Sequence, residues 1–143
     1  AEEIPNNEML CLECDALVPC ATQNQITKKI AEDLNTELIV EGANSPIDYQ
    51  GEEVVNQRGI SVLPDIISNS GGLIVSYFEW VQDLQALQWA KSQVSQKLKD
   101  IILRAFEKVY KVKHEDGLSY RDAAYQLALK RLIKALEYRG IYP

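Results

Sequence analysis

The stretch that decides the fold is Pro64-Asp-Ile-Ile-Ser-Asn-Ser-Gly-Gly-Leu-Ile-Val-Ser-Tyr-Phe-Glu-Trp80. It follows the short apolar run Ile60-Ser-Val-Leu63, which is typical of a buried strand. Asn69 is a preferred N-cap residue, so we expect a helix to begin there, with two glycines in its first turn. Each glycine in a helix costs about 1 kcal/mol relative to alanine, so the pair requires a reason.

Two explanations fit the paired glycines, and the local pattern leaves both open. Either a ligand approaches the backbone closely, or the helix packs tightly on a sheet. On a helix that begins at Asn69, the residues Asn69, Leu73 and Ser76 lie at i, i+4 and i+7 and share one face. An amide, an apolar side chain and a hydroxyl on one face predict one wall of a ligand site.

Upstream of this stretch, short apolar runs alternate with helical segments. This alternation indicates βαβ units and a parallel sheet, and continuous apolar runs are typical of strands covered on both faces. The residues therefore predict half of a doubly wound α/β domain. We expect strands at 15–20, 37–41 and 60–63, with helices at 27–34 and 52–58 between them.

Ligands of such sheets bind outside the carboxyl ends of the strands. That rule selects three loops, at 20–24, 42–45 and 64–72, each rich in small residues and side-chain amides. We expect these loops to face one ligand.

Downstream of Gly71 the apolar spacing is helical. We expect helices at 73–87, 93–115 and 119–139, with stops at Gly117 and Gly140. The sequence thus predicts an α/β unit over 1–72 and a helical segment over 73–143 that packs on it as one compact domain. The predicted core-facing stripes are Ile74, Tyr77, Phe78, Val81 and Leu84 in the first helix, and Ala123, Ala124, Leu127, Leu132 and Leu136 in the last.

Composition narrows the class of protein. The 143 residues suit one domain or part of a larger protein, and a net charge of −6 argues against a nucleic-acid partner. No apolar run approaches the roughly 18 residues of a membrane span, and no secretory signal pattern is visible. The odd count of 3 cysteines favours a reducing compartment, so we expect a cytoplasmic protein.

Few residues carry an obvious catalytic or metal-binding pattern. Cys11-Leu-Glu-Cys14 is a CxxC half-site for a metal or redox pair, but His114 is the only histidine, so reduced structural thiols are favoured. His114 itself is interpreted as a solvated residue at a helix end. Glu79 lies within a helix, where it is either a buried general base or, as is more common, the partner of a cation. Paired carboxylates, a Ser-His-Asp set and GxGxxG are absent, so no catalytic residue or metal ligand is assigned.

The opening stretch resembles the family of glutamate, leucine, phenylalanine and valine dehydrogenases, and most of all the glutamate dehydrogenases. The resemblance rests on Pro64-Asp65, Asn69-Ser-Gly-Gly72 and Val75-Ser-Tyr-Phe-Glu-Trp80. It extends to Val18-Pro-Cys-Ala-Thr-Gln-Asn-Gln-Ile-Thr27, Val40-Glu-Gly-Ala-Asn44 and the tail from Arg121-Asp-Ala-Ala-Tyr125 through Arg139-Gly140, and so covers nearly the whole chain.

This resemblance implies the second half of a Rossmann-like nucleotide-binding domain, with three short parallel strands and C-terminal helices. The family interconverts an L-amino acid with its 2-oxo acid and ammonia, using NAD or NADP. By position, Ala21, Asn44 and Asn69 would contact the cofactor near the nicotinamide and its ribose. Ser76 would hydrogen-bond the side-chain carboxylate of glutamate, with Leu73 at the apolar position beside it.

The resemblance also implies what lies elsewhere. The family's catalytic lysine and aspartate and its glycine-rich phosphate turn belong to regions upstream, so we expect this chain to be a fragment that is inactive alone. Family members assemble as hexamers, which predicts a homo-oligomer. One loop, Ser45-Pro46-Ile47-Asp48, departs from the more usual Gly-Pro-Thr-Thr. The alternative is a non-catalytic nucleotide-binding or assembly module that kept the fold.

Overall fold

The computed structural model describes residues 3–140, which divide into two compact units with a boundary between Leu73 and Ile74. We refer to the part before this boundary as the first unit and the part after it as the second unit.

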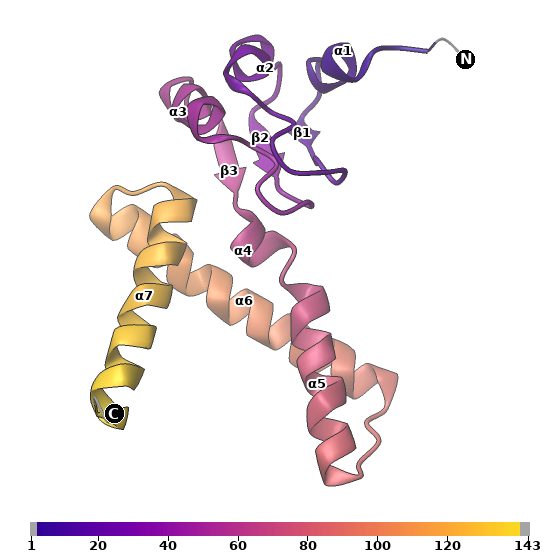
Figure 1. Cartoon of the computed structure of the whole chain (residues 1–143), viewed down its shortest axis with the longest axis vertical. Helices are drawn as coiled ribbons and strands as arrows, with labels where there is room; N and C mark the ends of the chain where they lie inside the picture. The colour runs from indigo at the N-terminus through magenta and orange to yellow at the C-terminus, as the bar shows by residue number, and fades with distance from the viewer. Residues whose placement is uncertain (1–2, 141–143) are drawn as a thin grey trace. The chain divides into compact units, whose positions relative to one another are not determined.

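The first unit is built on a parallel sheet of 3 strands in the order β1-β2-β3 (Figure 1). Its strands are β1 (Ala16–Leu17), β2 (Leu38–Val40) and β3 (Ser61–Leu63), paired with Ala16 beside Leu38 and Leu38 beside Ser61. The predicted parallel α/β sheet is confirmed. The strands are shorter than the apolar runs, because only two or three residues of each run form ladder pairs.

Helices α2 (Lys28–Asp33) and α3 (Tyr49–Gln57) connect these strands and lie side by side (Figure 1). A shorter helix, α1 (Asn6–Leu10), precedes β1. Residues one helical turn apart, such as Ile30 and Leu34, point to the same side and join the strand residue Ile39 in one buried cluster. Burial of each such side chain stabilises the fold by roughly 1.5–3 kcal/mol.

Polar groups fix the ends of both connecting helices. Asp48 is the N-cap of α3, and its side chain accepts a hydrogen bond of 2.6 Å from the Gly51 N–H. The Arg58 guanidinium donates to the carbonyls of Ala31 and Leu34, at 2.5 and 2.6 Å, and so satisfies the C-terminus of α2. Gly59 follows with φ +73°, which confirms that α3 closes at this glycine.

The prediction of one helix starting at Asn69 is wrong. A short helix α4 (Asp65–Ser68) follows β3 directly, and Asn69 is its C-cap, with its N–H donating to the Asp65 carbonyl. The long helix α5 (Gly71–Gln85) begins two residues later. Local N-cap preference lost to tertiary bonding because the Asn69 side chain donates to Asn44 across 25 residues of sequence. Asn69 therefore does not share a helix with Leu73 and Ser76.

The second unit contains most of α5 together with α6 (Lys91–Asp116) and α7 (Tyr120–Arg139), of which α6 and α7 pack on each other. Gly117 ends α6 in the left-handed region at φ +66°, as predicted. Ser119 begins α7: its hydroxyl accepts from the Asp122 N–H and donates to the Asp122 carboxylate. Gly140 is the C-cap of α7, as expected.

The predicted apolar stripes are covered only in part. Phe78 of α5 is buried against Trp89, and Ala123 and Ala124 of α7 are buried. In contrast, Leu132 is 61% exposed, and Tyr77, Leu84 and Leu136 are also exposed, which corrects the prediction for these residues. Helical spacing shows which side chains share a face but not whether another element covers that face. Within residues 3–140, no helix is both long and apolar enough to cross a membrane.

Candidate functional site

The loops after β1 and β2 are joined by backbone hydrogen bonds at the carboxyl ends of the strands. The N–H groups of Gly42 and Ala43 donate to the Pro19 carbonyl at 3.1 and 2.8 Å. The Asn24 N–H donates to the Ser45 carbonyl at 2.9 Å. Two loops that lie far apart in the sequence therefore form one surface.

Two carboxylates join the loop after β2 to the segment after β3. Glu41, which is 0% exposed, accepts the Asp65 N–H on its Oε2 at 2.8 Å. Asp65 in turn accepts the Ser45 N–H on its Oδ2 at 2.9 Å and the Ile66 N–H on its Oδ1 at 2.7 Å. Because these bonds join residues 20 and 24 positions apart in the sequence, they hold the loop after β2 against α4.

An amide pair lies beside these carboxylates. Asn69 Nδ2 donates to Asn44 Oδ1 at 2.8 Å, and the same group is 3.4 Å from the Gly42 carbonyl. Asn44 is exposed and Asn69 is half-buried. Ala21 is exposed in the first loop, between Pro19 and Asn24, which both bond to the second loop. The structure thus brings Asn44 and Asn69 into contact and places Ala21 in the loop joined to theirs.

The remaining two predicted site residues lie on α5, three positions apart. Leu73 is 77% exposed and Ser76 is exposed, and Ser76 belongs to the second unit. A Cβ added at Gly72 would meet no atom within 4 Å. Tight packing therefore does not explain Gly72, whereas close approach of a ligand stays a prediction.

The loops contain residues with positive φ, which the sequence did not predict. Asn24 and Ser45 have φ of +55° and +45°, in the left-handed region that L-residues other than glycine rarely adopt. Such a conformation costs roughly 1–2 kcal/mol, and strained residues cluster at functional sites. The departure from glycine at position 45 was the signal that could have located the strain.

The melting temperatures of variants at position 45 should follow how readily each residue type adopts positive φ. We expect Ser45→Gly to keep or raise the melting temperature of the full-length protein, because glycine adopts positive φ without a Cβ penalty. Ser45→Val should lower the melting temperature, since a β-branched residue is the worst fit to this region. Differential scanning fluorimetry of both variants checks the order, and a more stable valine variant would contradict it.

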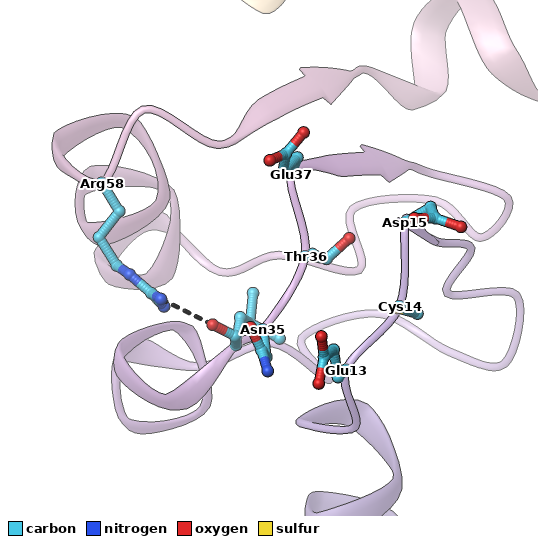
Figure 2. Close-up of a pocket in the computed structure, with 8 residues that line it drawn as sticks. Glu13, Cys14, Asp15, Asn35, Thr36, Glu37 and Arg58 are labelled. Carbon is cyan, nitrogen blue, oxygen red and sulfur yellow. Dashed lines mark hydrogen bonds between the residues drawn. The ribbon is translucent and has the colours of Figure 1, made fainter.

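A hollow of about 600 Å³ lies at the amino ends of the strands (Figure 2). Its lining comes from segments just before the strands, including Glu13, Asp15 and Glu37 (Figure 2), together with Arg58, whose guanidinium donates to the Leu34 carbonyl. Parallel sheets bind ligands at the carboxyl ends of their strands, so the loops there remain the better candidate site.

Metal-ligating side chains do not gather in the described part of the chain. No group of three or more His, Cys, Asp or Glu residues between positions 3 and 140 could hold a metal ion. Cys11, Cys14 and Cys20 are free thiols. Burial, followed by the nearby Asp33 charge, raises the pKa of the Cys11 thiol, which disfavours the reactive thiolate there.

Neither of the other single residues weighed from the sequence forms a catalytic arrangement. Glu79 is exposed, so the idea of a buried general base is wrong. His114 is exposed near the end of α6, and its ring lies 4.2 Å from that of Tyr110.

Comparison with known proteins gives consistent matches along the chain. The family model described as Glutamate/Leucine/Phenylalanine/Valine dehydrogenase matches residues 1–140. The glutamate dehydrogenase of Thermotoga maritima is 46% identical over 142 residues, covering 99% of this chain and 34% of that protein. The NAD-specific glutamate dehydrogenase of Clostridioides difficile is 39% identical, with the same coverage.

The fold also matches a solved structure closely. The crystal structure of hetero-hexameric glutamate dehydrogenase from Thermus thermophilus, in its leucine-bound form, has a TM-score of 0.94 and 33% sequence identity. The match covers 99% of this chain and 34% of that one. The 143 residues therefore span about 34% of the length of the relatives they match.

Proposed function

Because this chain belongs to the glutamate, leucine, phenylalanine and valine dehydrogenase family, we propose that it is part of a longer NAD-dependent glutamate dehydrogenase. The reaction is the reversible oxidative deamination of L-glutamate to 2-oxoglutarate and ammonia. The observation that carries the proposal is the similarity to glutamate dehydrogenases over 99% of the chain. NAD is preferred over NADP because the relative from Clostridioides difficile is NAD-specific.

The cofactor would bind at the carboxyl ends of the strands. Ala21, Asn44 and Asn69 are the proposed contacts near the nicotinamide and its ribose. The donor set fits such a group, because the bonded amides of Asn44 and Asn69 lie beside small residues in loops joined to each other. Carboxamide and ribose hydroxyl groups are recognised by amide donors and acceptors. When bound, NAD supplies the hydride acceptor for oxidation of the amino acid.

The substrate would be held by α5. We propose that Ser76 donates its hydroxyl hydrogen to the side-chain carboxylate of glutamate and that Leu73 provides an apolar contact beside it. Both side chains are exposed in the structure, as groups that contact a ligand must be. A hydrogen bond to a charged group is worth roughly 1.5–3 kcal/mol, which is enough to influence substrate choice.

Other parts of the longer protein would supply the chemistry. The proposed catalytic lysine and aspartate, like the glycine-rich phosphate turn, lie outside these 143 residues. The 143-residue chain alone should therefore be inactive. A hexamer is the proposed assembly, in line with the hetero-hexameric neighbour from Thermus thermophilus.

Activity of the full-length protein tests this proposal. We expect glutamate-dependent reduction of NAD, followed by absorbance at the wavelength of the reduced nicotinamide, with lower rates for NADP and for leucine or phenylalanine. The 143-residue chain is the matched control and should give no rate. A full-length protein that binds NADH without turnover of any amino acid would instead favour a non-catalytic nucleotide-binding module.

A further inference from the structure

We propose that Asp65 is a positioning residue that holds the strained loop after β2 in the shape needed to bind the cofactor. This inference rests on the proposed function, because it concerns the site assigned to NAD. Asp65 does not act on the substrate: it acts through Ser45 and its neighbour Asn44. All of the residues involved lie in the first unit.

The positive φ of Ser45 is unfavourable, so other interactions must stabilise this conformation. Ser45 has φ +45°, and its N–H, which that conformation turns toward α4, is held by Asp65 Oδ2 at 2.9 Å. The Ser45 carbonyl accepts the N–H of Asn24, which is also left-handed at φ +55°. The unfavourable conformation of Ser45 is thus fixed by hydrogen bonds on both sides of the residue.

Asp65 is itself held in place by a buried group. Its N–H donates to the carboxylate of Glu41, which is 0% exposed, and the hydroxyl of Ser68 donates to the Glu41 carbonyl at 2.5 Å. The end of β2 and the start of α4 are therefore fixed to each other before the loop is shaped. The Asp65 carboxylate has little freedom to follow Ser45 if the loop moves.

The conformation of Ser45 also affects the amide pair of Asn44 and Asn69. Asn44 precedes Ser45 directly, and its Oδ1 accepts from Asn69 at 2.8 Å. A change in the Ser45 backbone would turn the adjacent peptide and move Asn44 away from Asn69. The side chain proposed to face the cofactor is thus placed by a carboxylate that does not contact the cofactor.

The test is NADH binding by the full-length protein, followed by fluorescence titration. In Asp65→Asn, one of the two N–H groups of Ser45 and Ile66 must face an amide NH₂, because asparagine has only one acceptor oxygen. We expect the Kd for NADH to rise about ten-fold, the size of effect that loss of one charge-assisted hydrogen bond gives. The kcat at saturating NAD and glutamate should change much less.

Rescue by glycine separates positioning from general damage. In the double variant Asp65→Asn with Ser45→Gly, most of the NADH affinity should return, because glycine adopts positive φ without support. Asp122→Asn is the matched control, since the Asp122 carboxylate also accepts a hydrogen bond in the first turn of a helix, from the Ser119 hydroxyl, but in the second unit. Wild-type affinity in Asp65→Asn, an absence of rescue, or equal weakening in the control would each overturn the inference.

Two further measurements keep the inference testable if a variant or the cofactor assignment fails. Should Asp65→Asn not fold, Ser45→Val alone must weaken NADH binding while Ser45→Gly does not. Should the wild-type protein not bind NADH, the proposed function fails, and melting temperatures then judge the positioning role. In that case Ser45→Gly must raise the melting temperature more in the Asp65→Asn background than in the wild type, and an equal rise would overturn the inference.

Discussion

Replacing Ser76 with valine in the full-length protein is expected to lower kcat/KM for glutamate by roughly ten- to a hundred-fold. Valine is larger than serine and cannot donate a hydrogen bond, so the glutamate carboxylate would lose a partner when it leaves water. Ser76 is exposed on α5, so the substitution should disturb no packing of the chain itself. Initial-rate kinetics with glutamate provide the measurement.

Two controls make the Ser76 result interpretable. Ser95→Val changes another exposed helical serine of the second unit and should leave the kinetics unaltered. Rates with leucine or norvaline should fall less than those with glutamate in Ser76→Val, because these substrates have no side-chain carboxylate to lose a hydrogen bond. If glutamate preference is unchanged, Ser76 does not contact the substrate.

Replacing Gly51 with alanine should destabilise the protein, although alanine is normally the better helix former. Gly51 is buried in α3, and an added Cβ would lie 2.5 Å from the carbonyl oxygen of Ile26. That oxygen is backbone and accepts the Asp48 N–H, so it cannot move without breaking the bridge between Ile26 and Ile47. Overpacking of this kind costs about 1–3 kcal/mol or more, which outweighs the gain of about 1 kcal/mol in helix propensity.

Gly72→Ala is the matched control for this prediction. Gly72 is also helical, in α5, but a Cβ there would meet nothing within 4 Å. Its melting temperature should therefore stay the same or rise, whereas that of Gly51→Ala should fall. Differential scanning fluorimetry of the two full-length variants decides the point. If Gly51→Ala were as stable as the wild type, the close contact between α3 and the Ile26 carbonyl would be wrong.

Several features could be predicted from the sequence because they depend on local pattern. The three apolar runs separated by helical segments were enough to predict parallel strands, since a helix between two neighbouring strands of one sheet usually makes them parallel. The carboxyl-end rule then selected the loops that carry Asn44 and Asn69 before any contact was known. Gly117 and Gly140 predicted the ends of α6 and α7 because their backbone preference acts within one turn.

The features that sequence reasoning missed all depend on partners distant in the chain. Asparagine is favoured at helix N-caps, yet Asn69 ends α4 because its side chain bonds to Asn44. The role proposed for Asp65 depends on Ser45, 20 residues away, and on the buried Glu41. In the sequence, Glu41 is only a charged residue after an apolar run, and nothing there indicates that it is buried. Exposure of Leu132 could not be known from helical spacing, which says nothing about what covers a face.

The sequence by itself therefore determined the family, the parallel sheet and the three segments that follow its strands, although the third of these is the helix α4 and not the predicted loop. The tertiary structure alone decided how those loops are shaped: a left-handed Ser45, a carboxylate that holds it, and an amide pair beside it. The reason is physical. Local propensities differ by about 1 kcal/mol or less, and a few hydrogen bonds between distant residues are enough to override them.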